Sequence, residues 1–253
     1  MSELKGKTAL ITGAATGIGR SIATTMAEAG AKLCLVDINE VGLKETAQSL
    51  PNETLSINCD VTDIDQMNAA VAKAEDRFGG VGVAVLNAGV VGTSAPVDEY
   101  PLEVFDAVMR VNVRGVWCGL QSLLPGMLAR KNGAITITSS LSGVMGFHGV
   151  SAYTASKHAV IGMMRSASIE AAPFNVRVNA IAPGFIDTQM VAELEKRMNP
   201  DDPGSVRAAC EDRTPLKRYA DPREVANLVK FLSSDDASFC AGGVYSVDGG
   251  FAT

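Results

Sequence analysis

TALITGAATGIG, residues 8–19, is the stretch that decides the fold. It opens with an apolar run typical of a buried β-strand. It then passes through three glycines into residues 17–30, where apolar side chains recur every four positions, as on one helix face. Glycines between a strand and a helix permit a tight turn, and the helix N-terminus offers free N–H groups and a positive dipole end. The segment predicts a cradle for the pyrophosphate of a dinucleotide, and the alternative is an ordinary strand-to-helix turn. The cradle residues are Gly13, Thr16, Gly17, Ile18 and Gly19.

Short apolar runs recur along the chain and alternate with helical patterns. Because the runs are continuously apolar, we expect both faces of their sheet to be covered. Strands separated by helices imply right-handed βαβ units. The predicted fold is α/β: a single Rossmann-type doubly wound parallel sheet of about seven strands, with helices on both faces, in one domain over residues 1–253. The predicted strands are residues 8–11, 33–36, 55–59, 83–86, 134–138, 176–181 and 244–247.

Composition narrows the class of protein. The chain has 253 residues, 47% of them apolar, and Lys+Arg 22 against Asp+Glu 28 leave a net charge of −6. This balance argues against nucleic-acid binding through a general positive field. The five cysteines are scattered without a CxxC pair, so we expect neither a disulfide framework nor a metal site. Because we find no apolar signal region and no run of about 18 apolar residues, we expect a soluble cytoplasmic protein without a membrane partner.

Two carboxylates follow predicted strands. Asp37 ends the second strand, where a carboxylate can accept both hydroxyls of an adenosine ribose and repel a 2′-phosphate. No Lys or Arg adjoins Asp37, so we predict NAD rather than NADP; the alternative is a surface carboxylate in a loop. Asp60 and Val61 end the third strand, where the adenine would lie. For Asp60, capping of the helix predicted to begin near Asp63 is an equal alternative.

Tyr153 and Lys157 are four residues apart, which puts them one turn apart on the same face of a helix. A phenol titrates near about 10, and a neighbouring ammonium or the positive ring of an oxidised nicotinamide favours its phenolate. Such a pair can exchange a proton with an alcohol or ketone oxygen, and a serine at a strand end can orient that oxygen. Considered alone, the pair is more often an ordinary exposed helix pair. The glycine cradle reverses that judgement.

With these motifs the sequence resembles the short-chain dehydrogenase/reductase family over nearly the whole chain. The shared elements occur in family order: Thr12-Gly13-xxx-Gly17-Ile18-Gly19, Asn87-Ala88-Gly89, Asn112, Ser140, Tyr153-xxx-Lys157 and Pro183-Gly184. The resemblance implies that Tyr153 is the general acid/base and that Lys157 lowers its pKa and holds the nicotinamide ribose. It also implies that Ser140, rather than Ser139 or Ser142, orients the substrate oxygen.

The resemblance assigns further positions. Asn112 would anchor a water that extends a proton relay from Lys157 towards solvent. The segments before and after the catalytic residues would contact the cofactor; their residues are Asn87, Ala88, Gly89, Pro183, Gly184, Ile186 and Thr188. Many family members carry a further Asn where this chain has Leu86, and we expect a small local packing change there.

Residues 187–215 form an irregular zone after a strand end, which predicts a lid over the substrate. Six apolar residues near the site could line a substrate pocket, although such residues are more often core or interface: Met145, Phe147, Val150, Phe185, Met190 and Met198. His148 either contacts a polar substrate group or is a solvated loop residue.

The function that these features favour is an NAD-dependent oxidoreductase that exchanges a hydride between the cofactor and a secondary alcohol or ketone with an apolar body. A 3-oxoacyl thioester reductase is the alternative, sugar or polyol oxidation comes third, and a non-catalytic dinucleotide-binding regulatory protein is the hypothesis from another class. The helical patterns at 103–130 and 151–172 are apolar on more than one face. Because members of the family that the sequence resembles form tetramers and dimers, these helical patterns favour a homotetramer, with a dimer as the alternative.

Overall fold

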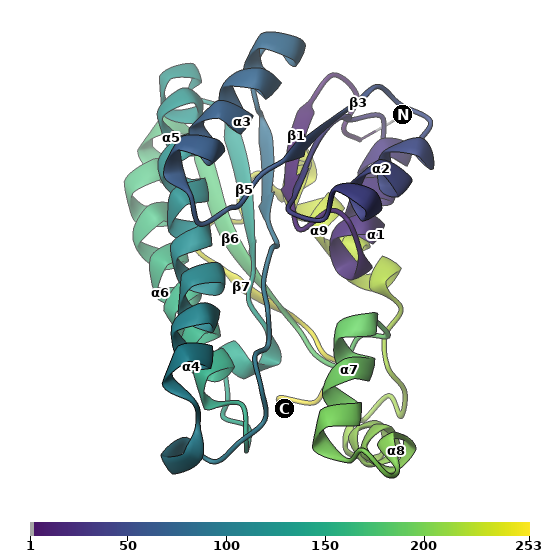
Figure 1. The fold of residues 1–253 in the computed structure, drawn as a ribbon. Coiled ribbons are helices and arrows are strands. Elements are labelled where there is room, and N and C mark those ends of the chain that lie inside the picture. The colour runs from purple at the N-terminus through teal and green to yellow at the C-terminus, as the bar shows by residue number, and fades with distance from the viewer. Residues whose placement is uncertain (1–2) are drawn as a thin grey trace.

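The seven strands form one sheet in which every neighbouring pair is parallel (Figure 1). The computed structural model describes residues 3–253. The strands lie in the order β3-β2-β1-β4-β5-β6-β7, so the chain winds outward in both directions from β1 and β4. The strands are β1 (Thr8–Thr12), β2 (Lys32–Asp37), β3 (Thr54–Asn58), β4 (Val83–Leu86), β5 (Gly133–Thr138), β6 (Val176–Pro183) and β7 (Val244–Val247). The predicted doubly wound sheet is confirmed, with ends shifted by one or two residues.

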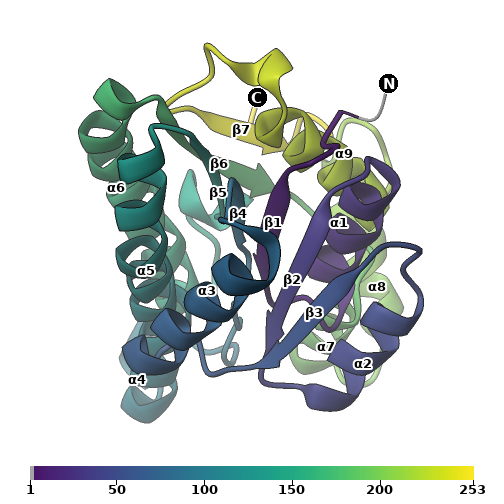
Figure 2. The same cartoon turned by 90° about the horizontal axis from the view of Figure 1, so that it is seen from above.

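Helices cover both faces of this sheet (Figure 2). One face carries α1 (Gly17–Glu28), α2 (Glu40–Gln48) and α9 (Pro222–Ser233), and the other carries α3 (Ile64–Phe78), α5 (Gly115–Arg130) and α6 (Ser151–Ala171). Alternate residues of a strand therefore enter different cores. In β1, Leu10 belongs to the cluster under α3, α5 and α6, whereas Ala9 and Ile11 belong to the cluster under α1 and α9. This two-sided burial explains why the strand sequences are apolar without alternation.

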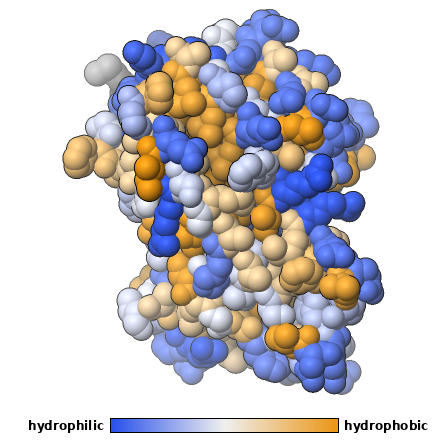
Figure 3. Space-filling model, turned by 90° about the vertical axis from the view of Figure 1, so that its left-hand side faces the viewer, coloured by the Kyte–Doolittle hydropathy of each residue, from blue (hydrophilic) through white to orange (hydrophobic). Residues whose placement is uncertain are grey.

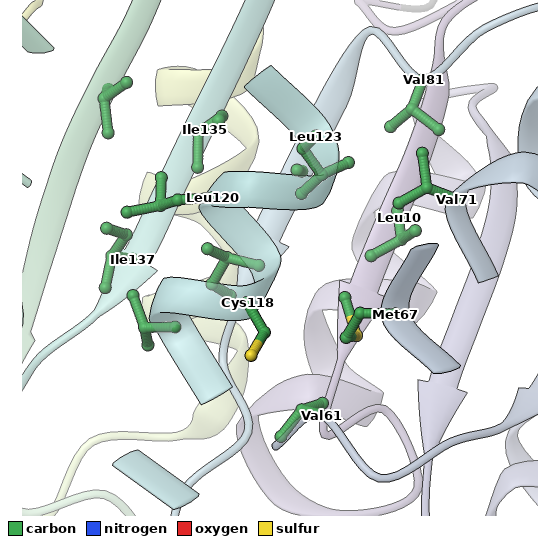
Figure 4. Close-up of a cluster of buried hydrophobic side chains, with 14 of the residues drawn as sticks. Leu10, Val61, Met67, Val71, Val81, Cys118, Leu120, Leu123, Ile135 and Ile137 are labelled. Carbon is green, nitrogen blue, oxygen red and sulfur yellow. The ribbon is translucent and has the colours of Figure 1, made fainter. Parts of the chain in front are cut away.

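The larger core lies between the sheet and helices α3 and α5 (Figure 4). Ile135 and Ile137 of β5 and Leu123 of α5 are almost completely buried in it, as is Met67 of α3. Close packing of this layer fixes α5 and α6 against the sheet. It therefore fixes the start of α6, where Tyr153 and Lys157 lie.

The helical pattern predicted over residues 103–130 is not one uniform helix. It consists of α4 (Leu102–Met109), a π-helical turn (Arg110–Arg114) and α5. In the turn, the Gly115 N–H donates to the Arg110 carbonyl five residues earlier. Asn112 lies within the turn and is completely buried. Such wide turns inside helices occur frequently at functional sites.

The expectation of an irregular segment over residues 187–215 is wrong, because most of it is helical. It contains α7 (Gln189–Met198) and α8 (Pro203–Arg213), and both stand apart from the sheet in Figure 1. Side chains cap both helices: Thr188 Oγ1 accepts from the Val191 N–H, and Asp202 Oδ1 accepts from the Ser205 N–H. In α7, Met190, Leu194 and Met198 recur every four positions, a helical signal that the prediction of an irregular segment overlooked, whereas α8 shows no such period.

None of the helices among residues 3–253 has the length and apolar character needed to cross a membrane.

Candidate active site

A cleft of about 440 Å³ opens at the carboxyl ends of the strands. It is lined by the loops that follow β1 to β6 and by the first turn of α6. Ligands in open α/β sheets bind in this crevice, where the strand order reverses. All the predicted cofactor-binding residues and three of the four predicted catalytic residues line it: Gly13, Thr16, Gly17, Ile18, Gly19, Asp37, Asp60, Val61, Asn87, Ala88, Gly89, Ser140, Tyr153, Lys157, Pro183, Gly184, Ile186 and Thr188.

The glycine loop is packed so closely at Gly13 and Gly19 that neither position has room for a side chain. A Cβ on Gly19 would lie 1.9 Å from the Gly13 carbonyl oxygen, and a Cβ on Gly13 would lie 2.9 Å from the Ala88 Cα. Gly13 also has a φ of +67°, which favours glycine. The Asn87 amide donates to the carbonyls of Thr12 and Gly13 and so ties the end of β4 to the loop. The loop is thus held open for a phosphate group by contacts of the main chain.

Asp37 joins the end of β2 to the glycine loop. Its Oδ2 accepts from the Ala15 N–H and its Oδ1 from the Asn39 N–H, both at 2.9 Å. These bonds fix the carboxylate in the wall of the cleft. Its position fits recognition of a ribose diol, because a carboxylate there accepts hydroxyl protons and repels phosphate.

Two residues that support this loop escaped the sequence analysis. Arg20 of α1 donates from Nη2 to the Ala15 carbonyl at 2.7 Å, and its Nε donates to Thr46 Oγ1 at 2.9 Å. Thr46 of α2 is completely buried and donates its hydroxyl proton to nearby main-chain carbonyls. An arginine and a threonine on ordinary helices carry no sequence signal of this role.

Asp60 and Val61 lie where the adenine was expected, in the cleft wall after β3. The cap of α3 is Asp63, which accepts from the Asp65 and Gln66 N–H groups. Asp60 instead accepts from the Thr62 N–H and shapes the loop. The alternative reading of Asp60 as the helix cap is therefore wrong.

Tyr153 and Lys157 share one face of α6, as predicted, and both line the cleft. Lys157 Nζ lies 5.5 Å from the centroid of the Tyr153 ring and donates to the Thr138 carbonyl at 2.8 Å. Burial lowers the pKa of the Lys157 amine to about 8. Burial raises the pKa of the Tyr153 phenol, and a hydrogen bond with Ser140 opposes that rise. The expected lowering of the Tyr153 pKa by Lys157 is thus not the dominant effect in the protein alone, because desolvation disfavours the phenolate.

The three serines after β5 have different surroundings. The Ser139 hydroxyl donates to the Lys157 carbonyl at 2.9 Å and is buried. The Ser142 side chain is buried too, and its N–H donates to Ser140 Oγ at 3.1 Å. Ser139 and Ser140 both line the cleft, but only Ser140 of the three hydrogen-bonds Tyr153. Its contacts fit the predicted orienting role better than those of its neighbours.

Asn112 lies behind the cleft and does not line it. Its Nδ2 donates to the Val90 carbonyl and to Ser156 Oγ, at 2.8 and 2.9 Å, and its Oδ1 accepts from the Val90 N–H. A Cβ on Gly89 would lie 3.2 Å from Asn112 Oδ1 and 3.4 Å from Lys157 Nζ. Asn112 and Lys157 therefore both lie beside Gly89, and both amide protons of Asn112 are bonded to protein groups. The predicted water relay stays a proposal.

The structure separates the remaining candidate residues into those that line the cleft and those that do not. Of the six apolar residues considered for a pocket, Met190 lines the cleft. Phe147 and Phe185 pack against each other outside its wall, with ring centroids 6.4 Å apart. His148 is exposed on its loop and does not line the cleft, which favours its reading as a solvated residue.

Known proteins match the chain over nearly its whole length. A family model described as enoyl-(acyl carrier protein) reductase matches residues 13–252. Levodione reductase of Leifsonia aquatica is 37% identical over 95% of this chain and 92% of that protein. Cis-4-hydroxycyclohexanecarboxylate dehydrogenase of Sinomonas cyclohexanicum is 39% identical over 97% of this chain and 96% of the relative.

Solved structures agree with these sequence matches. A crystal structure of levodione reductase has a TM-score of 0.95 at 36% identity, covering 98% of each chain. The structure of NAD⁺-bound xylitol dehydrogenase has a TM-score of 0.94 at 34% identity and covers 98% of this chain and 100% of that chain. The matches confirm the predicted enzyme class, an oxidoreductase that uses NAD(H) and acts on CH–OH groups. With its fold, cleft and sequence matches in agreement, the chain belongs to the short-chain dehydrogenase/reductase family.

Proposed function

We propose that the protein oxidises a secondary alcohol on an apolar ring, reversibly to the ketone, with NAD⁺ rather than NADP⁺. The observation that carries this proposal is the meeting of Ser140, Tyr153 and Lys157 in the wall of the same cleft that holds the glycine loop. The fit to the cofactor rests on the glycine loop, where any side chain on Gly19 would collide with the main chain, and on the oriented carboxylate of Asp37. NAD⁺ bound along this cleft supplies the hydride acceptor.

Side chains of the protein carry out the proton transfer that accompanies the hydride transfer. Ser140 donates a hydrogen bond to the substrate oxygen and holds it beside the Tyr153 hydroxyl. The Tyr153 phenolate accepts the proton of the substrate hydroxyl, so it acts as the general base in oxidation and as the general acid in reduction. Lys157 is mostly protonated at neutral pH with its pKa of about 8, and its positive charge stabilises that phenolate.

We propose that α7 and α8 form the lid over the substrate. The start of α7 supports this role, because it lines the cleft opposite the catalytic residues of α6. The lining residues there are Thr188, Gln189, Met190 and Val191. Ile186, Met190 and Val191 give this side of the cleft an apolar character. An apolar wall suits a substrate with a hydrocarbon body and a single reacting polar group.

The names of the relatives support a ring-shaped substrate, since one of them is a dehydrogenase of a hydroxycyclohexane carboxylate. The description of the matching family model instead favours an acyl carrier thioester substrate as the second candidate. The two are separated by measuring NADH formation or consumption with cyclohexanol, cyclohexanone and an acetoacetyl thioester. Faster turnover of the thioester would replace the first candidate by the second. Binding of NADH without turnover on any of these substrates would favour the non-catalytic regulatory hypothesis.

Asp37→Ala tests the choice of cofactor. Removing the carboxylate is expected to reduce kcat/KM for NAD⁺ by about tenfold to a hundredfold, because a charge-assisted hydrogen bond contributes about 1.5–3 kcal/mol. The value for NADP⁺ is expected to stay constant or rise, since repulsion of its phosphate is lost. Measurement of both cofactors with one alcohol checks this, and an unchanged preference would contradict the role of Asp37.

We also propose a homotetramer that assembles in the cytoplasm, where reduced thiols such as the buried Cys34, Cys59 and Cys118 persist.

The support for the homotetramer is the outer face of α4, α5 and α6, on which apolar side chains gather in patches (Figure 3). Trp117 is 58% exposed there and borders a shallow hollow with Met109, Val113 and Met163. Phe239, beyond α9, is completely exposed and offers a second apolar contact. Sedimentation equilibrium of the protein tests the state, and a monomer would contradict it.

A further inference from the structure

The residues that follow β7 lie against the loop that begins at Gly184, directly after β6. The Gly184 N–H donates to the Val247 carbonyl at 2.9 Å, and a Cβ on Gly184 would lie 2.8 Å from the Asp248 Cα. The Asp248 carboxylate accepts from the N–H groups of Gly250 and Ala252, both at 3.1 Å. These bonds fold residues 247–252, which we call the C-terminal strap, into a defined turn.

The C-terminal strap also contacts residues 213–216, at the end of α8 and just after it. The Leu216 N–H donates to the Gly249 carbonyl at 3.2 Å, and a Cβ on Gly249 would lie 2.8 Å from Thr214 Cγ2. Thr214 is buried at this contact. Arg213, the last residue of α8, places its guanidinium 4.9 Å from the centroid of the Phe251 ring, a cation–π contact.

Phe251 completes an aromatic cluster, which we define as Phe147, Phe185, Tyr219 and Phe251. The Phe251 ring centroid lies 6.0 Å from that of Phe147 and 5.4 Å from that of Phe185. Phe185 also stacks on Tyr219, at 5.5 Å with an interplanar angle of 18°. Pairs at these separations stabilise by about 0.5–1.5 kcal/mol beyond burial. The cluster thereby joins segments that are far apart in the sequence.

Each aromatic partner of Phe251 belongs to a segment of the site. Phe147 lies in the loop that connects Ser140 to Tyr153, and Phe185 follows Pro183 and Gly184 directly. Neither Phe147 nor Phe185 lines the cleft, and Phe251 does not line it either. The three rings lie outside the lining of that cleft and connect the loop between Ser140 and Tyr153 to the loop after β6.

We propose that Phe251 is a positioning residue for the substrate, acting through Phe147 and Phe185. This inference rests on the proposed function and extends it to the chain's C-terminal strap. Loss of the Phe251 ring frees the two loops to move apart, so the substrate oxygen is held less well between Ser140 and Tyr153. The glycine loop and Asp37, which are assigned to the pyrophosphate and the adenosine ribose, lie after β1 and β2, away from the cluster, and should keep their geometry.

The test compares Phe251→Ala with Phe251→Leu, Phe251→Tyr and a matched control, Phe78→Ala. Phe78 is also half-buried with cations over its ring, those of Lys32 and Arg77, but it lies at the end of α3, away from the cleft. Phe251→Ala is expected to raise the KM for the alcohol about tenfold, with kcat changed less and the Kd for NADH within about twofold. The Leu and Tyr variants should restore most of the loss, and Phe78→Ala should leave the KM unchanged.

Hydrogen exchange of the NADH complex gives a second reading that does not need turnover. Residues 141–150 and 183–188 should exchange faster in Phe251→Ala than in the wild type, and should be unchanged in Phe78→Ala. Protection equal to wild type in Phe251→Ala, or an equal KM rise in Phe78→Ala, would overturn the positioning role. Absence of turnover in the wild type would instead refute the proposed function, and the exchange measurement would still decide the role of Phe251.

Discussion

The cofactor side and the substrate side of the cleft are built by different means. Around the glycine loop, the main chain of β1 touches that of the loop after β4, and the space left by Gly13 and Gly19 is already filled. Over the substrate side, α8 buries no residue and α7 buries Glu195 alone. Under the proposed function, the constant ligand, the cofactor, is held by close main-chain packing, whereas the variable ligand, the substrate, is covered by helices with little core of their own.

The contacts that hold α7 and α8 in place are largely polar. Arg207 of α8 pairs with Asp187 and with Glu211, each at 3.1 Å, and its guanidinium lies 4.5 Å from the centroid of the Tyr219 ring. All three charged groups are substantially exposed, so such ion pairs stabilise by about 0–1 kcal/mol each. The substrate side is therefore expected to open at a lower free energy than the cofactor side.

The largest effect expected from this comparison is that of Gly19→Ala. Its Cβ would stand 1.9 Å from the Gly13 carbonyl oxygen, so the loop must shift and the phosphate cradle is lost. We expect NADH binding to weaken by at least about a hundredfold, in line with the cost of misplaced binding groups. Fluorescence titration of NADH measures this. Gly82→Ala is the control, since no atom lies within 4 Å of its Cβ, and affinity similar to that of the control would contradict the packing argument.

The second effect is a pH dependence of stability at Lys157. Burial lowers the pKa of this amine to about 8, whereas an unfolded lysine titrates near about 10.4. Between these pH values the unfolded chain keeps a proton that the folded protein has lost. The contribution of Lys157 to the free energy of unfolding therefore rises with pH across this window, by up to about 3 kcal/mol.

Urea unfolding of the wild type and Lys157→Met at pH 7.5, 9 and 10.5 measures this contribution. The variant lacks the titrating amine, so the wild type should gain stability relative to it as the pH rises. The buried thiols of Cys34 and Cys59, with pKa values raised to about 12 and about 11, act on both proteins and cancel in the difference. A difference that stays constant over this range would show that the amine is not desolvated.

The smallest effect concerns the substrate side itself. Glu195 is buried in α7 near the Tyr219 hydroxyl, whose pKa it helps to raise, but neither its Oε1 nor that hydroxyl has a partner at hydrogen-bond geometry within residues 3–253. Glu195→Gln keeps the shape and removes a desolvated charge, so we expect the free energy of unfolding to rise by about 1 kcal/mol. Glu193→Gln on the same helix, half-exposed, should change it by less than about 0.5 kcal/mol. Thermal unfolding compares them, and a less stable Glu195→Gln would indicate that the carboxylate has a partner that stabilises it.

The same contrast explains what the sequence could predict. The strands were predictable because residues such as Leu10 and Ile11 face two different cores, which makes the run apolar throughout. That the residues after β1 and β2 line one cleft was predictable, because a dinucleotide site requires glycines and a carboxylate at fixed positions after these strands. Helix α8 was not, since its few apolar residues show no helical period. In α7, Met190, Leu194 and Met198 do recur every four positions, so this helix could have been predicted.

Long-range support could not be predicted for a different reason. Phe251 meets Phe185 across 66 positions of sequence, and Arg20 reaches Thr46 of another helix. Neither contact follows from local pattern, because a phenylalanine near a chain end and an arginine on a helix face are ordinary residues. Such contacts arise from the fold as a whole. Motifs in the sequence could therefore point to residues of the cleft wall, whereas the contacts of Arg20 and Phe251 could not be predicted.

Turnover by Tyr153→Phe tests directly whether the Tyr153 hydroxyl transfers the proton. This change removes the hydroxyl that exchanges the proton and keeps the ring in place. We predict that kcat for alcohol oxidation falls by at least about a hundredfold, with NADH binding retained, because general acid–base catalysis contributes about 10²–10⁴ in rate. Tyr245→Phe, on β7 and outside the cleft wall, should keep its activity. Turnover by Tyr153→Phe equal to that of the wild type would contradict the assignment of Tyr153 as the proton-transferring group.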